Sequence, residues 1–282
     1  NQSTADLRWY LFGSNQFGGG VSNAHNGVMA YEHAYQGVEA RKAYFFMGDA
    51  MVCMGSGIKA ARTQEVRTSV NQCLANGEVT YGLSGHTYRL TNNLSDKNID
   101  WAYHDNVGYI FPQNESVTLR KAKQTGAWRE LEVTASDKPV TKEIFSLWVS
   151  HGTTPQHEDY CYIIMPDKPL SYFTDKKFEN EIKIIVNSEQ IQAISNENKR
   201  QYAAVFYEPG EIRFAEDLVV AVNKKVIIYI EKKDKQYEIA VADPLYKEQS
   251  LQLSMNGEQI NIVFPSGDYS GSSVIKHITE KH

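Results

Sequence analysis

Short apolar segments rich in aromatic or β-branched residues recur along the first part of the chain, and helical periodicity between them is hard to find. Residues that favour turns, such as Gly, Asp, Asn and Pro, or a Lys bound each segment. The segments are residues 42–47, 50–54, 107–111, 144–149 and 160–165. Such strands without intervening helices are typical of antiparallel sandwiches, because parallel strands need crossover connections. The pattern therefore predicts an all-β fold.

A second pattern begins after Pro166. Asp167-Lys168-Pro169 has the composition of a turn, and a polar stretch follows it. Beyond this point apolar and polar residues alternate more regularly, at residues 182–186, 224–230, 237–241 and 260–264. Asp234-Lys235 and Asn256-Gly257 fall between predicted strands as hairpin turns. We therefore expect two antiparallel β-sandwich domains, residues 1–172 and a smaller C-terminal domain of residues 173–282.

Composition narrows the class of protein. The chain has 282 residues, of which 41% are hydrophobic, enough to form a sizeable core. No apolar run approaches the roughly 20 residues that span a bilayer, so we expect no membrane span. The net charge is −5, which argues against nucleic acid as a partner.

The cysteines and the first residue bear on the protein's surroundings. Cys53, Cys73 and Cys161 lack CxxC spacing, so we expect buried thiols and no structural metal site, although one disulfide could form in an exported protein. The chain begins at Asn1 with no signal-like segment, and we expect that residues upstream have been removed.

Several ordered segments resemble the polysaccharide lyases of family eight, which include chondroitin, hyaluronan and xanthan lyases. The segments are residues 17–23 (FGGGVSN), 39–46 (EARKAYFF), 51–58 (MVCMGSGI), 68–73 (TSVNQC), 101–112 (WAYHDNVGYIFP), 144–152 (IFSLWVSHG) and 160–166 (YCYIIMP). A weaker match, residues 241–244 (VADP), follows in the C-terminal part. The order of so many matches makes the resemblance specific from about residue 17 to 166.

The resemblance implies an architecture and an activity. Family members have an N-terminal helical toroid, a central β-supersandwich and a small C-terminal β-sandwich. This chain is similar to the later part of the supersandwich plus the C-terminal domain, and the toroid is absent from it. The implied function is the β-region of a secreted or periplasmic lyase. Its partners would be an acidic polysaccharide, chondroitin sulfate or hyaluronan, and the toroid of the same enzyme, with no cofactor required.

The family's chemistry is β-elimination at a uronic acid. A base takes the C5 proton, the neighbouring carboxylate is neutralised, and a proton reaches the leaving oxygen. The family supplies Tyr, His, Asn and Arg, mostly from the toroid, and a Glu that aligns upstream of Phe17, before Asn1. The resemblance therefore places no catalytic residue on this chain, which we predict to be inactive alone. A carbohydrate-binding module or a purely structural scaffold remain alternatives.

Three histidines are candidates for catalytic or metal-binding groups. His104 precedes Asp105, but neighbours in a strand point to opposite faces, so we predict a structural role. His151 and His157 flank a turn-rich segment and could form a metal pair, although side chains satisfied by the turn are favoured.

The segment of residues 12–26 is rich in Gly, Asn, Gln and Ser, and such amides bind sugar hydroxyls well. We predict substrate contacts from Asn15, Gln16 and Asn23; a surface hairpin with positive φ is the alternative. Some family members hold calcium near this stretch, and Asn23 and Glu32 could supply ligands here. Val21, however, stands where an acidic ligand is expected.

The tryptophans could stack on sugars or fill the core. We expect Trp148 to be buried in an apolar strand, and Trp101 and Trp128 to seal the interface between sheets.

Overall fold

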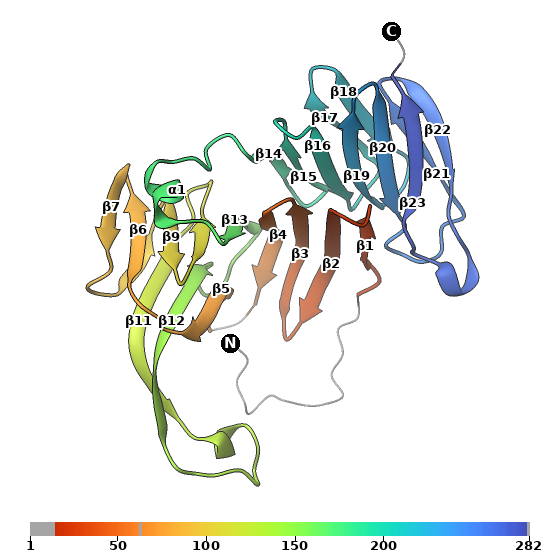
Figure 1. Ribbon diagram of the computed structural model, residues 1–282. Helices are drawn as coiled ribbons and strands as arrows, with labels where there is room; N and C mark the ends of the chain where they lie inside the picture. Colours follow the sequence, from red (N-terminus) through yellow and green to blue (C-terminus); the bar gives the residue numbers. More distant parts are fainter. Residues whose placement is uncertain (1–14, 62–63, 281–282) are drawn as a thin grey trace.

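The structure is a computed structural model that describes residues 15–61 and 64–280. Within these residues four antiparallel sheets account for nearly all regular structure, so the predicted all-β fold is confirmed (Figure 1). No helix in this part of the chain is long and apolar enough to cross a membrane.

Sheet A is the largest, with the strand order β1-β2-β3-β4-β13-β10-β9-β6-β7. Its strands are β1 (Gly18–Ser22), β2 (Gly27–Tyr35), β3 (Val38–Met47), β4 (Ala50–Ala60), β6 (Val79–Leu83), β7 (His86–Arg89), β9 (Trp101–His104), β10 (Val107–Ile110) and β13 (Glu158–Pro166). Sheet B has the order β5-β12-β11-β8. Its strands are β5 (Arg67–Leu74), β8 (Leu94–Lys97), β11 (Val117–Gly126) and β12 (Val140–Ser150), with a 3-10 turn, Trp128–Glu130, between the last two.

The C-terminal part forms two further sheets. Sheet C has the order β14-β15-β16-β19-β20-β23, and sheet D the order β17-β18-β21-β22. The strands of sheet C are β14 (Lys183–Asn187), β15 (Ile191–Asn196), β16 (Gln201–Phe206), β19 (Val226–Lys233), β20 (Gln236–Ala242) and β23 (Val274–Thr279). Those of sheet D are β17 (Gly210–Ala215), β18 (Leu218–Val222), β21 (Ser250–Met255) and β22 (Glu258–Val263), and a 3-10 turn at Gly267–Tyr269 precedes β23. Strand pairing does not join sheets A and B to sheets C and D.

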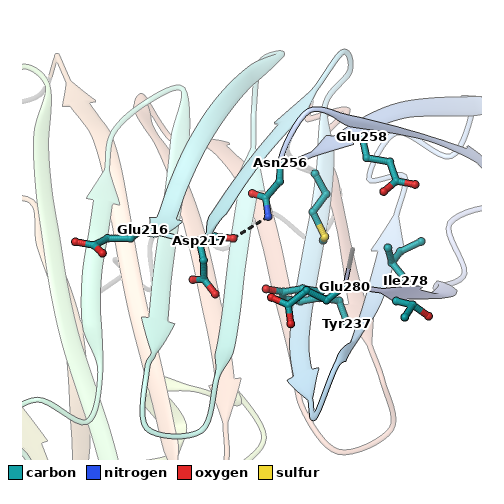
Figure 2. Close-up of a pocket in the computed structure, with 9 residues that line it drawn as sticks. Glu216, Asp217, Tyr237, Asn256, Glu258, Ile278 and Glu280 are labelled. Carbon is teal, nitrogen blue, oxygen red and sulfur yellow. Dashed lines mark hydrogen bonds between the residues drawn. The ribbon is translucent and has the colours of Figure 1, made fainter. Parts of the chain in front are cut away.

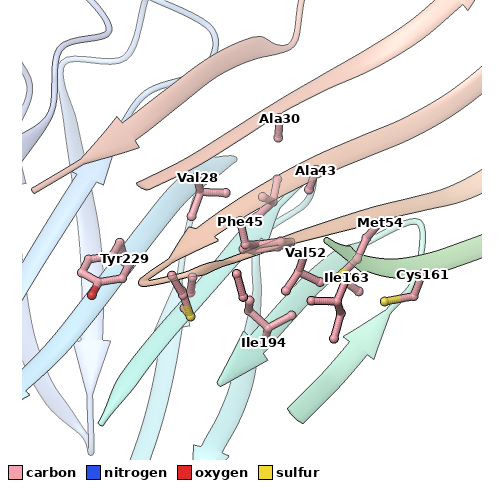
Figure 3. Packing of buried hydrophobic residues seen from close by; sticks show 14 of the residues in the cluster. Val28, Ala30, Ala43, Phe45, Val52, Met54, Cys161, Ile163, Ile194 and Tyr229 are labelled. Atoms are coloured by element: carbon pink, nitrogen blue, oxygen red, sulfur yellow. The ribbon is translucent and has the colours of Figure 1, made fainter. Parts of the chain in front are cut away.

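Three apolar cores separate the four sheets. One lies between sheets A and B and another between sheets C and D. The third joins the two halves of the chain: Phe45 and Val52 of sheet A meet Ile194 and Tyr229 of sheet C (Figure 3). Sheet A is thus covered on both faces, which explains why β4 is a continuous apolar run and not an alternating one.

The two predicted hairpin turns are confirmed. Asp234-Lys235 joins β19 to β20, and Asn256-Gly257 joins β21 to β22. Asn256 and Gly257 have φ values of 50° and 84°, as a two-residue type I′ turn requires.

The proposed domain boundary lies in an ordered connection. Residue 172 falls inside the short helix α1 (Leu170–Thr174), which links β13 to β14. Phe173 of this helix is fully buried and packs on Trp101 and Tyr103 of sheet A. The connection is therefore part of the core beneath it.

Two of the three tryptophan predictions are wrong. Trp101 is buried as expected. Trp128, at the tip of the long β11–β12 hairpin that projects from the body, is 61% exposed (Figure 1). Trp148 alternates with Phe145, Leu147 and Val149, so it lies on the outer face of sheet B and is only partly buried.

Candidate saccharide-binding groove

A polar groove of about 210 Å³ lies where Asn15 enters the β1–β2 hairpin. Strands β2, β3 and β4 line it, together with the turn between β14 and β15. The lining residues are Asn15, Glu32, His33, Ala34, Glu39, Ala40, Arg41, Gly57, Lys59 and Glu189.

Asn15 and Gln16 are both exposed at this entrance. The Asn15 amide donates to the carbonyl oxygen of Glu32, which fixes the side chain and leaves its own oxygen without a partner among the described residues. Gln16 makes no side-chain hydrogen bond there. Residues 12–14 of the predicted loop lie outside the described residues. The positions of Asn15 and Gln16 are compatible with the substrate contacts predicted for them.

Arg41 contacts groove residues from both halves of the chain. Its guanidinium donates to the Glu189 carbonyl, lies 3.4 Å from the Glu32 carboxylate and stacks 5.2 Å from the ring centre of Tyr207. Because Glu189 and Tyr207 belong to the C-terminal half, these contacts join the two halves at the groove. Arg41 is therefore engaged in structural contacts on several sides.

The groove carries charges of both signs. Lys59 pairs with Glu39 at 2.8 Å, and this hydrogen bond raises the pKa of Lys59. Burial lowers the pKa of His33, which favours its neutral form. His157 lies 2.6 Å from the Glu189 carboxylate at the adjoining surface. Mixed, paired charges with amides suit hydrogen bonds to neutral sugar hydroxyls better than capture of a polyanion.

Asn23 has a different role from the predicted one. Its Oδ1 accepts from the N–H groups of His25 and Asn26, and its Nδ2 donates to Glu231 and Glu238 on sheet C. The side chain is 7% exposed, and its hydrogen-bonding capacity is used. Asn23 therefore ties the β1–β2 turn to sheet C, and its geometry does not fit substrate contact.

The same turn matches the surface-hairpin alternative, since Ala24 has a φ of 75°. The calcium interpretation does not fit. The register pairs Ser22 with Gly27 and Gly18 with Tyr31, so Asn23 and Glu32 lie at opposite ends of the β1–β2 ladder. Among the described residues no group of three His, Cys, Asp or Glu is arranged to hold a metal ion.

The histidines have structural partners. His104 is 1% exposed, stacks on Phe145 and accepts the Asn76 N–H at 3.0 Å, as its predicted structural role requires. Asp105 lies in the β9–β10 turn and not in the strand, contrary to our expectation. His151 lies 2.8 Å from the Thr68 hydroxyl, and burial lowers its pKa to about 4.

A larger hollow, of about 820 Å³, lies at one end of the C-terminal sandwich (Figure 2). Glu216, Asp217, Glu258 and Glu280 line it, and Asn256 donates to the Asp217 carbonyl. Lys232 pairs with Asp217 and Glu280. Four carboxylates around one opening disfavour an acidic polysaccharide there.

Comparisons with known proteins agree with this architecture of stacked sandwiches. The structure of chondroitinase AC lyase, described in complexes with oligosaccharides, superposes with a TM-score of 0.88 at 29% identity, covering 95% of this chain and 40% of that one. Paenibacillus xanthan lyase gives a TM-score of 0.83 at 19% identity and shares the fold, covering 95% of this chain and 29% of that one.

The super-sandwich domain of polysaccharide lyase family 8 matches residues 1–177, and the C-terminal beta-sandwich domain of that family matches residues 183–252. The chain belongs to polysaccharide lyase family 8. Chondroitinase-AC of Pedobacter heparinus is 31% identical over 277 residues, 94% of this chain and 39% of its own length. Hyaluronate lyase of Thermasporomyces composti is 24% identical over 84% of this chain and 30% of its own length. The chain thus spans about two fifths or less of these relatives.

Proposed function

We propose that this chain is the β-region of a glycosaminoglycan lyase that cleaves chondroitin sulfate or hyaluronan by β-elimination. The observation that carries the proposal is the 31% identity to Chondroitinase-AC across almost the whole chain. A helical toroid would complete the enzyme. Because polysaccharides do not cross the cytoplasmic membrane unaided, a secreted or periplasmic location follows from the proposed activity.

Within that enzyme the segment supports the fold and forms part of the rim of the cleft, and it lacks the main catalytic residues. In support, His104 and His151 are held in buried contacts, and Arg41 is held by paired groups. Neither histidine is a free base beside an open surface, and a guanidinium does not act as a base. We assign the proton transfers to the toroid and the residues upstream.

The first test incubates the isolated chain with chondroitin sulfate and with hyaluronan and follows the unsaturated product by ultraviolet absorbance. We expect no turnover by the chain alone and turnover by the complete enzyme. Turnover by the isolated chain would contradict the assignment of chemistry to other segments. An inactive complete enzyme would contradict the lyase proposal itself.

The second test concerns the groove. In the complete enzyme, the pair Asn15→Ala and Gln16→Ala should raise KM by roughly 5- to 100-fold with a smaller effect on kcat, because hydrogen bonds to neutral hydroxyls contribute binding throughout the reaction. The matched control is Gln113→Ala with Asn114→Ala, an exposed amide pair elsewhere on the surface. Unchanged kinetics would leave Asn15 and Gln16 with a structural role only.

A further inference from the structure

The outer face of sheet B carries a second polar groove, of about 90 Å³, which shares no lining residue with the groove at Asn15. Residues of β5, β11 and β12 line it: Arg67, Ser69, Asn71, Gln72, Arg120, Gln124, Ser146 and Trp148. The strand register explains this grouping. Ser146 pairs with Arg120 on one side and Gln72 on the other, and Trp148 pairs with Ser69.

Two of the residues that line this groove carry a polar atom with no partner in the part of the chain that the structure describes. The Ser146 hydroxyl and the Trp148 indole N–H are both shielded from solvent and form no hydrogen bond within the described residues. Ser146 is only 6% exposed. Because buried polar groups are nearly always paired, two unpaired groups on adjacent positions of one face indicate a place for an external acceptor.

The charged side chains that line the groove are basic. Arg67 and Arg120 line it, and no acidic side chain does. Arg67 is held by Glu65, with 2.8 Å between Nε and Oε2, and its guanidinium lies 4.7 Å from the ring centre of Trp148. Arg120 is exposed and makes no ion pair or hydrogen bond with any described side chain. Its guanidinium is therefore available to an anion.

We propose that this groove binds an oxyanion substituent of an acidic saccharide, a sulfate ester or a uronate carboxylate. Arg120 would donate charge-assisted hydrogen bonds, and the Ser146 hydroxyl and Trp148 indole would donate to other oxygens of the same group. The amides of Gln72 and Gln124, which make no hydrogen bond with a described side chain, would reach neighbouring sugar hydroxyls. The saccharide part of the proposal rests on the proposed function, whereas oxyanion binding rests on the groove alone.

The test is a titration of the isotope-labelled chain that follows the indole N–H resonance of Trp148, assigned with Trp148→Phe. Sodium sulfate is the probe, and sodium chloride at matched ionic strength is the reference. We expect a saturable shift with sulfate that chloride does not reproduce. Equal responses to the two salts would overturn the proposal.

Three variants locate the effect. Arg120→Gln should weaken sulfate binding about tenfold or more, the value of one charge-assisted hydrogen bond. Ser146→Ala should weaken binding several-fold without lowering Tm, since the hydroxyl has no partner in the protein to lose. Lys123→Gln, on the same strand but the opposite face, should leave binding within about twofold. An equal loss in Lys123→Gln would contradict a specific site.

A second titration distinguishes the two sources of the oxyanion. The probes are an unsaturated chondroitin disaccharide without sulfate and its singly sulfated counterpart. Tighter binding of the sulfated sugar would assign the groove to sulfate, and equal binding of both would assign it to the carboxylate. If inorganic sulfate binds and neither sugar does, the saccharide part is overturned. None of these outcomes depends on lyase activity.

Discussion

Glu115 is a buried carboxyl group in the connection between β10 and β11. It is 6% exposed, and its Oε1 accepts the Cys161 N–H at 2.7 Å. Burial raises the pKa of Glu115 to about 7, and the charge of Asp159 adds to this rise. Between the unfolded pKa near 4.5 and the folded value, the folded state binds a proton that the unfolded state releases. This contribution to stability is therefore present at acidic pH and lost as pH rises toward 7, by on the order of 3 kcal/mol.

We expect Glu115→Gln to be more stable than the parent at pH 8, because the amide still accepts from Cys161 and carries no charge. The difference should vanish or reverse at pH 5. His151 has the opposite effect over a similar pH range, because its lowered pKa makes the free energy of unfolding fall as pH falls. The pH dependence of the parent protein alone therefore does not isolate the contribution of Glu115. Denaturant unfolding at pH 5 and 8 measures the difference. Glu211→Gln, at an exposed carboxylate, is the control. A difference that does not change with pH would contradict the role of Glu115.

Among the elements, α1 packs against a glycine of the sheet beneath it. Gly108 of β10 lies directly under the Phe173 ring, and a Cβ at this glycine would overlap that ring. We expect Gly108→Ala to destabilise the fold by about 1–3 kcal/mol through overpacking. The same substitution in a Phe173→Ala background should cost much less, which a double-mutant cycle measures. Gly126→Ala, with space around it, is the matched control. Additive costs would show that the two positions are independent.

The apolar runs predicted from the sequence fall in strands, but other strands were not predicted, including the apolar β16 and β18. Residues 42–47 and 160–165 lie in β3 and β13 because both strands are buried, and their composition reflects burial. Strands β5 and β7 were not predicted because polar residues dominate them, and every residue of β7 is exposed. For the site, sequence alone did not predict the contacts of Asn23, whose partners Glu231 and Glu238 are more than 200 residues away. Local patterns do not contain such long-range contacts.

The whole molecule is a stack in which sheets A and C each contribute to two cores. Ile194 and Tyr229 of sheet C pack on sheet A, whereas Ala193 and Ile228 on its other face pack on sheet D. The second of these cores lies wholly within the C-terminal half, as independent folding requires. The first would be exposed if the halves were separated. The proposed division near residue 172 therefore implies two sandwiches that can fold separately and are stabilised by their contact.

A protein of residues 176–282 tests this division. We expect it to give the circular dichroism of a β protein and a cooperative unfolding transition, because the core between sheets C and D is complete in it. It should also bind a hydrophobic dye more strongly than the whole chain and unfold at a lower temperature, since Ile194, Val205 and Tyr229 lose their cover. The control places a charge on that exposed face: Val205→Lys should reduce dye binding in the fragment and destabilise the whole chain. A disordered spectrum from the fragment would show that the C-terminal sandwich needs sheet A to fold, and the division into two domains would then be wrong.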